Sequence, residues 1–349
     1  MRMVKKSLLL AATAASLAVV MPGTALASEP TPPVSDSSIV FAGSDTTEYV
    51  IDAIATAYNA QSPAPARNAY SYLAEGTATL QTKTSASATL ARPVGSGAGI
   101  SALLDVNNTN TLNASGTRTH VDVARSSSDP SAGPSSLLFV PFAVDAVTWA
   151  AKSGGNAPAN LTTQQLHDIY SCTVTNWSAV GGTSGTIAPV LPQANSGTRK
   201  MFLSKIGVTT PGTCVTSNDS IVENEGTNAV FTGANAANVL VPYATSKFIA
   251  QENQLPNAAA DLRGSLTLRQ VNSVAPRNAD GTLNSGFPYK REVYNVVIGS
   301  TIPAYLQGLL SDTGYLCNDG QSIVEQYGFA PLVPGDDDDC GFGIPGTGV

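Results

Sequence analysis

The residues best suited to chemistry lie at 193–200, where the sequence reads QANSGTRK. An apolar run at 187–191 precedes them and predicts a strand, and MFLSKI at 201–206 predicts a helix. Ser196 is a good N-cap for that helix, and Gly197 lets the backbone approach a ligand closely. Thr198 adds a hydroxyl and Arg199 a planar cation. Because a helix N-terminus presents unpaired N–H groups and partial positive charge, the segment predicts an anion-binding turn. An ordinary capped helix is the alternative.

Three other turns share this design, with hydroxyls and backbone N–H groups at the start of an element. They contain Thr46 and Thr47 in GSDTT, Ser96 in PVGSGAG, and the run Arg125, Ser126 and Ser127. Two of the four turns carry an arginine, the side chain suited to bidentate recognition of oxyanions. Together the four turns could surround one tetrahedral oxyanion.

The sequence contains few features of a catalytic site. The chain has two histidines, His120 and His167, and no serine stands in a G-x-S-x-G turn that would mark a hydrolase nucleophile. No phosphate-binding Walker motif and no metal-ligand spacing is present. We therefore expect a protein that is not an enzyme, with no catalytic residues, no cofactor and no metal.

Strand-like and helix-like runs alternate along the chain. Strands are predicted at 38–42, 67–73, 121–124, 138–144, 187–191, 239–243 and 293–298, and helices at 48–60, from 100, from 161, from 201, from 225, at 302–310 and at 322–327. Pro141 inside one strand predicts a crossing or edge position. The alternation indicates an α/β fold with largely parallel sheets.

The first 27 residues have the features of a cleaved signal peptide. Arg2, Lys5 and Lys6 precede an apolar stretch at 8–20, and ALA at 25–27 predicts cleavage after Ala27. We expect an exported protein, secreted or periplasmic, and no lipid anchor, since no cysteine follows the cleavage site. Removing three cations leaves a net charge of about −10, which argues against nucleic acid as a partner.

Four cysteines in an exported chain predict two disulfides. Three pairings are possible, and we favour Cys172–Cys214 and Cys317–Cys340 because each closes a local loop.

At this point the motifs resemble one family, the phosphate-binding proteins of bacterial phosphate-uptake ABC transporters. The resemblance covers about residues 38–335. It rests on GSDTT at 43–47, VGSGAGI at 94–100, VDVARSS at 121–127, LTTQQLHDIY at 161–170, TNWSAVGG at 175–182 and NSGTR at 195–199. The combination is specific, although each piece alone is not.

The resemblance implies a two-lobed periplasmic-binding-protein fold of type II, with the ligand in the cleft between the lobes. After a linker at 28–37, lobe one would comprise 38–140 and 290–349, and lobe two 141–289. The implied function is binding of inorganic phosphate or a similar oxyanion and its delivery to an ABC permease, by a monomer. The implied ligand residues are Thr46, Thr47, Ser96, Arg125, Ser126, Ser127, Ser196, Gly197, Thr198 and Arg199.

This chain departs from the family pattern at two places. Many members carry an aspartate where Ser127 stands, and it accepts a proton from bound phosphate; Asp129 could replace it only if the loop shifts. Some members carry an arginine where Pro192 and Gln193 stand, whereas Arg199 lies after the turn. Such an aspartate would reject a fully deprotonated anion. Because this chain has Ser127 at that position, the sequence does not determine which oxyanion binds.

Two other functions remain open at this level. One is a secreted phosphoester hydrolase, and the other is a surface or matrix interaction protein that retains the fold without transport.

Overall fold

The computed structural model describes residues 33–74, 76–86, 89–105, 109–255, 261–332 and 339–348. The predicted signal peptide and the start of the linker lie outside the described residues. Within them, no helix has both the length and the apolar character needed to cross a membrane.

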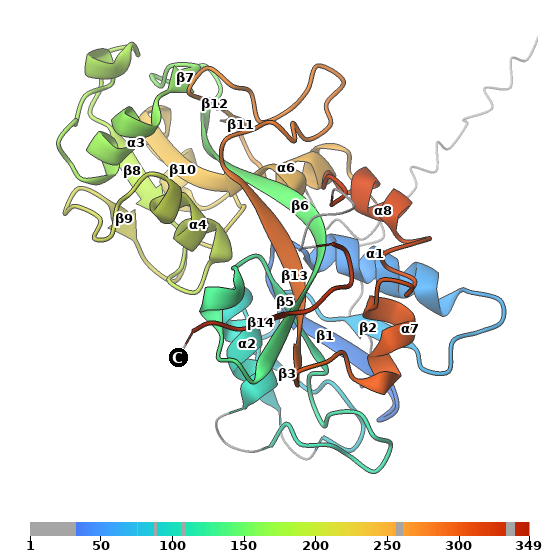
Figure 1. The fold of residues 1–349 in the computed structure, drawn as a ribbon. Helices are drawn as coiled ribbons and strands as arrows, with labels where there is room; N and C mark the ends of the chain where they lie inside the picture. Colours follow the sequence, from blue (N-terminus) through green and yellow to red (C-terminus); the bar gives the residue numbers. More distant parts are fainter. Residues whose placement is uncertain are drawn as a thin grey trace, which may run out of the picture.

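A single mixed sheet extends through both halves of the molecule (Figure 1), with strand order β2–β1–β5–β13–β6–β10–β8–β9. β1 (Ile39–Gly43) pairs in parallel with β2 (Ala69–Ser71) and β5 (Val123–Ser126), and we call this side lobe 1. β10 (Val239–Ala244) pairs in parallel with β8 (Ala188–Leu191), which pairs with β9 (Thr216–Ser217), and we call this side lobe 2. The α/β prediction is confirmed, but the expectation of largely parallel sheets is wrong, because the central strands pair antiparallel with their neighbours.

Two long antiparallel strands join the lobes. β13 (Lys290–Ile298) pairs with β6 (Leu137–Lys152) from Leu137 to Ala146, and the remainder of β6 pairs with β10. The strand predicted at 138–144 is longer than the sequence pattern indicates, because the apolar run continues through VTWAA. Pro141 lies in this central strand, beside the irregularity in register between Val293 and Tyr294 of β13. A proline is tolerated there because a bulge interrupts the ladder.

Each lobe has its own apolar core. In lobe 1, α1 (Glu48–Asn59) buries Ile51, Ile54 and Tyr58 against β1, β6 and β13. In lobe 2, Trp149 of β6 stacks on Trp177 with ring centroids 6.2 Å apart. The exact residue limits of the lobes remain a prediction.

The other helices that bear on the site begin where a strand or turn ends. They are α2 (Ser96–Leu104), α4 (Gly197–Lys205) and α6 (Thr245–Glu252). The remaining helices are α3 (Thr163–Tyr170), α5 (Ala229–Thr232), α7 (Gln307–Leu310) and α8 (Gln321–Gln326). The remaining strands are β3 (Thr79–Leu80), β4 (Leu90–Ala91), β7 (Asn160–Leu161), β11 (Leu266–Leu268), β12 (Gln270–Val271) and β14 (Ile344–Pro345).

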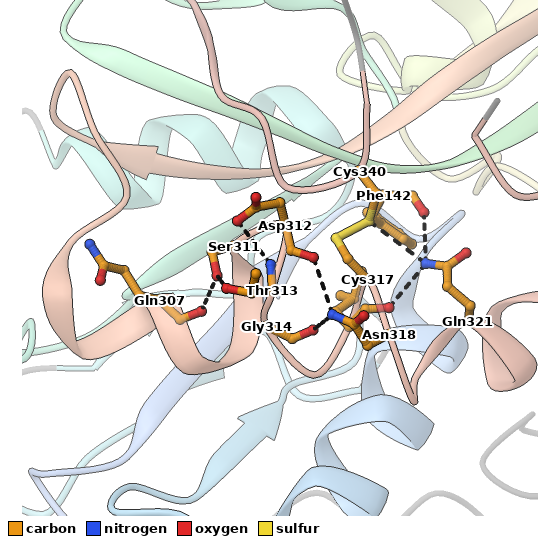
Figure 2. Close-up of a disulfide and its surroundings, with 11 residues drawn as sticks. Phe142, Gln307, Ser311, Asp312, Thr313, Gly314, Cys317, Asn318, Gln321 and Cys340 are labelled. Atoms are coloured by element: carbon orange, nitrogen blue, oxygen red, sulfur yellow. Dashed lines mark hydrogen bonds between the residues drawn. A yellow bond between two sulfur atoms is a disulfide. The ribbon is translucent and has the colours of Figure 1, made fainter. Parts of the chain in front are cut away.

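Both predicted disulfides are confirmed. Cys172 is bonded to Cys214 in lobe 2, and Cys317 to Cys340 near the C-terminus. Figure 2 shows the second bond beside Gln321, whose amide donates to the carbonyls of Phe142 and Leu316. This bond fastens the segment that leads into β14, and β14 pairs with β6 at Phe139 and Leu138.

Candidate functional site

Five hydroxyl side chains meet where the two lobes face each other. Ser44, Thr46, Ser96 and Ser127 come from lobe 1 and Thr198 from the start of α4; we call them the hydroxyl cluster. Ser127 Oγ lies 3.2 Å from the hydroxyls of both Ser44 and Ser96, and Ser127 N–H donates to Ser96 Oγ at 2.9 Å. Thr46 and Thr198 hydroxyls are 3.3 Å apart. All five side chains are buried.

Two glycines let the lobes approach this closely. A Cβ at Gly197 would collide with Ser127 Oγ and lie 2.8 Å from Ser96 Oγ. A Cβ at Gly95, which has a φ of +92°, would lie 2.9 Å from the carbonyl oxygen of Asn195. Contact between the turn before α2 and the turn before α4 therefore needs glycine on both sides.

Arg291, at the start of β13, is the cation that faces the hydroxyl cluster. Its Nη2 donates to the hydroxyls of Thr198 at 3.1 Å and Thr46 at 3.3 Å, and its Nη1 donates to the carbonyl of Ser127 at 3.0 Å. Asp145 of β6 holds the guanidinium with two bonds of 2.8 and 3.1 Å. Arg291 thus reaches both lobes from one of the strands that join them.

A second cation, Lys247 of α6, bridges the lobes beside the cluster. Its ammonium binds the carboxylates of Asp45, at 2.8 Å, and Glu48, and lies 3.7 Å from the ring centroid of Tyr49. Asn224 donates from its amide to the other oxygen of Asp45 at 2.7 Å. These buried contacts connect the first turn of α1 to lobe 2.

A buried glutamate occupies the N-terminus of α4. Glu223 Oε2 accepts from Ser196 Oγ at 2.6 Å and from Thr198 N–H at 3.3 Å, while its Oε1 has no hydrogen-bond partner among the described residues. Burial raises the pKa of Glu223, and the negative charge of Asp45 raises it further. The bond from Ser196 and the charge of Arg291 act on this pKa in the opposite direction.

The two lobes differ in how their helix N-termini are capped. Ser196 caps α4 by accepting from Arg199 N–H at 2.9 Å. Thr47 precedes α1 without a side-chain cap, and its buried hydroxyl has no hydrogen-bond partner in the described part of the chain. The N-cap of α2 is Gly95, which has no side chain to cap with. The N-termini of α1 and α2 therefore lack the side-chain cap that α4 has.

Neither of the two predicted arginines is brought to the hydroxyl cluster by the structure. Arg125 lies at the end of β5, where it donates to the carbonyls of Gly43, Ser44 and Tyr72 and to the Ser71 hydroxyl. These bonds use the guanidinium to hold the turn between β1 and α1. Arg199 donates to the carbonyl of Pro192 at 2.8 Å and to Ser217 Oγ at 2.6 Å, on the β8–β9 side of lobe 2.

Ser126 also turns away from the other hydroxyls. Its Oγ donates to Ser128 O at 2.9 Å and accepts from Ser128 N–H at 3.1 Å, which shapes the turn after β5. Asp129 accepts from Ser131 N–H at 2.9 Å, is exposed, and caps a short 3-10 helix at Pro130–Ala132. In this structure Glu223, rather than Asp129, is the carboxylate at the cluster.

Sequence reasoning missed Arg291, Asp145, Glu223, Asn224 and Lys247. One signal was available: Asp145 interrupts an apolar run, and a buried carboxylate requires a cationic partner. The partner, Arg291, lies 146 residues away in sequence, so its identity depended on the fold. Among the described residues, no group of three or more His, Cys, Asp or Glu side chains is placed to hold a metal ion.

A mixed sheet shared by two lobes, with buried polar groups gathered between them, defines a two-lobed periplasmic-binding-protein fold of type II. Residues 27–297 match the model of the PBP superfamily domain, so the chain belongs to that superfamily. No match was found among curated protein sequences.

Solved structures share this fold. An ABC-type phosphate transport receptor from Vibrio cholerae aligns with 20% identity and a TM-score of 0.54, over 84% of this chain and 100% of that one. A putative phosphate ABC transporter substrate-binding protein with bound phosphate, from Clostridium perfringens, aligns with 19% identity and a TM-score of 0.57, over 85% of this chain and 100% of that one. At these identities the likeness concerns the fold alone.

Proposed function

We propose that the protein binds inorganic phosphate or a similar tetrahedral oxyanion between its lobes, without turnover, and delivers it to an ABC permease. The observation that carries this proposal is the convergence of the hydroxyl cluster and Arg291 on one buried place reached from both lobes. Hydroxyl groups, free helix N-termini and a guanidinium are the donors that an oxyanion requires. The similar structures from Vibrio cholerae and Clostridium perfringens support the same ligand.

Binding requires the lobes to separate and close again. In the closed arrangement the hydroxyls bond to one another and Glu223 occupies the start of α4, so an entering anion replaces these contacts. β6 and β13, the two strands that join the lobes (Figure 1), are the connections about which such a motion would occur. The predicted ligand residues Thr46, Thr47, Ser96, Ser127, Gly197 and Thr198 remain in this proposal, and Arg291 joins them.

The signal-like residues 1–27 support export, and the net charge supports a small anion held by local donors rather than by the overall field. Among the described residues, no histidine contacts the hydroxyl cluster, so the serine–histidine pair of a typical hydrolase is not assembled there. We propose a monomer, which sedimentation of the mature chain would check.

Calorimetric titration of residues 28–349 with phosphate, arsenate and sulfate tests the proposal. We expect saturable binding of phosphate and no release of phosphate from a phosphomonoester. Hydrolysis of the ester would instead support the hydrolase, and absence of binding to all three anions would support an interaction protein.

A further inference from the structure

An open cavity lies beside the hydroxyl cluster and has a volume of about 720 Å³. Ser127, Gly197 and Arg291 belong both to the cavity wall and to the site described above. The loop after β5 forms the wall on the lobe 1 side, and α4 forms the wall on the lobe 2 side. The cavity therefore continues outward from the place proposed for the anion.

The volume exceeds what one small anion needs. A water molecule occupies about 30 Å³ in the liquid, so the cavity corresponds to roughly two dozen waters. A single tetrahedral oxyanion at Ser127 and Arg291 would leave most of this space to solvent.

Half of the lysines in the described residues gather here. Of the six, Lys83 and Lys247 are buried in ion pairs, Lys152 lies elsewhere, and the other three, Lys200, Lys205 and Lys290, line this cavity. The structure shows no ion pair for these three within the described part of the chain. Apart from Arg291, which pairs with Asp145, the cavity wall carries these three lysines and two carboxylates, Asp129 and Glu292, and so has a net positive charge in a chain with 25 acidic residues.

The two carboxylates of the cavity wall each accept a hydrogen bond from a neutral neighbour, and no salt bridge of 4 Å or less joins them to the three lysines in the described residues. Asp129 accepts from Ser131, and Glu292 accepts from the hydroxyl of Tyr294 at 2.8 Å. On the opposite side, a Cβ at Gly97 would lie 3.3 Å from Lys200 Nζ, so this ammonium spans from α4 to the start of α2. Two of the lysines lie on α4 and the third lies at the start of β13.

We propose that this cavity holds the second phosphate group of a condensed phosphate, pyrophosphate or a longer chain, whose first group binds at the hydroxyl cluster. The inference rests on the proposed function and names the ligand class of the same site. Lysine ammonium groups act as point charges on phosphate oxygens and tolerate varied geometry, which suits a flexible chain of phosphates. Because the cavity is open, it also accommodates the additional length.

The test is calorimetry on residues 28–349 with orthophosphate, pyrophosphate and tripolyphosphate, in EDTA and at fixed ionic strength. We expect pyrophosphate to bind at least about tenfold more tightly than orthophosphate. The double variant Lys205→Ala/Lys290→Ala should weaken pyrophosphate binding about 2- to 30-fold, since each exposed charge pair contributes modestly, and orthophosphate binding less than about twofold. Lys152→Ala, which removes a lysine outside the cavity, is the matched control and should change neither.

The outcomes separate this inference from the proposed function. Tight orthophosphate binding with no preference for pyrophosphate overturns the inference and leaves the proposed function standing. The inference also fails if the double variant weakens both ligands equally, or if glycerol phosphate binds as tightly as pyrophosphate. Failure of all phosphates to bind overturns both.

Discussion

The helix N-termini of the two lobes face the same place and are prepared differently. In lobe 1, α1 and α2 begin without side-chain caps, and the Thr47 hydroxyl is buried without a partner among the described residues. In lobe 2, α4 has both a serine cap and the carboxylate of Glu223 against its first turn. An uncapped N-terminus retains its donors for a ligand, whereas a capped one has used them internally. α1 and α2 of lobe 1 therefore begin without a side-chain cap, whereas the start of α4 in lobe 2 already contacts the carboxyl group of Glu223. α6 of lobe 2 also lacks a side-chain cap, but Ser246 N–H in its first turn donates to Asp145 at 3.1 Å.

Arg291 cannot be assigned to one lobe, because it lies on β13, one of the two strands that join the lobes. It donates to one hydroxyl from each side, so its loss should produce the largest effect. We expect Arg291→Lys to weaken phosphate binding about 10- to 150-fold, as a charge-assisted bond to a buried group is worth about 1.5–3 kcal/mol. Calorimetry measures this effect.

Lysine is the informative replacement, because alanine would leave Asp145 buried and unpaired, at a cost of about 3–5 kcal/mol in folding. Arg277→Lys is the control, since Arg277 pairs with Glu252 on the surface of lobe 2. Unchanged phosphate affinity in Arg291→Lys would mean that the site lies elsewhere.

The effect of the Glu223 carboxyl group, which lies at the start of α4, on anion binding can be tested directly. The pKa of Glu223 is raised in the folded protein, so its neutral form is favoured by folding and its ionised form is not. Glu223 therefore stabilises the fold fully at pH values below its pKa in the unfolded chain. This stabilisation is lost as the pH rises through its higher pKa in the folded protein. An ionised Glu223 would also repel a bound anion, so binding should be accompanied by proton uptake wherever Glu223 is ionised in the free protein.

We expect Glu223→Gln to bind sulfate about tenfold more tightly at high pH and with a flatter pH profile, because an amide cannot repel the anion. Sulfate is the probe because it does not itself titrate in this range. Calorimetry in two buffers of different ionisation enthalpy would show the proton uptake disappear. Asp219→Asn, an exposed position in the same segment, is the control. Equal proton uptake by the parent and Glu223→Gln would exclude this role.

How much of this site the sequence predicts depends on the range of the interactions involved. The turns at Thr46, Ser96, Ser127 and Thr198 are local patterns, small polar residues before a helix or after a strand, and the structure brings all four together. Which arginine reaches them is a long-range property. Arg199 is adjacent to one of these turns, but its side chain bonds to Ser217, whereas Arg291 reaches the hydroxyl cluster from a strand far along the chain.

α6 was missed for a related reason. It begins directly after β10 with no side-chain cap, so no turn or capping residue marks its start. Its Lys247 is buried by tertiary contacts with Asp45 and Glu48 of lobe 1, which no local pattern encodes. The apolar periodicity of α1 and the apolar runs of β1 and β10, in contrast, were sufficient to predict these elements.

Substitution of Ser96 tests whether the start of α2, in lobe 1, contributes to the proposed anion site. The Ser96 hydroxyl accepts from Ser127 N–H and lies at the uncapped start of α2. We expect Ser96→Ala to weaken phosphate binding about fivefold, the effect of one hydrogen bond of about 1 kcal/mol. Ser101→Ala on the exposed side of the same helix should leave affinity unchanged. If both variants bind equally well, α2 does not contribute to the anion site.

Substitution of Arg199 should change phosphate affinity least. It tests whether proximity in sequence to the turn at 195–198 is enough to make a residue a ligand. The residue follows the turn that most resembles an anion site, yet its guanidinium donates to Pro192 O and Ser217 Oγ, away from the hydroxyl cluster. Burial lowers the pKa of Arg199, and nearby Asp219 partly offsets this, which describes a half-buried cation in a local surface network. Such contacts contribute about 0–1 kcal/mol.

We therefore expect Arg199→Ala to change phosphate affinity less than about threefold and to lower the melting temperature slightly, because it loosens the connection between β8 and β9. Titration of Arg199→Ala and Arg291→Lys side by side gives the comparison. A loss in Arg199→Ala as large as that in Arg291→Lys would show that the guanidinium swings into the cleft when the lobes open. The capped end of α4 would then be part of the anion site, and the distinction between the two lobes would fail.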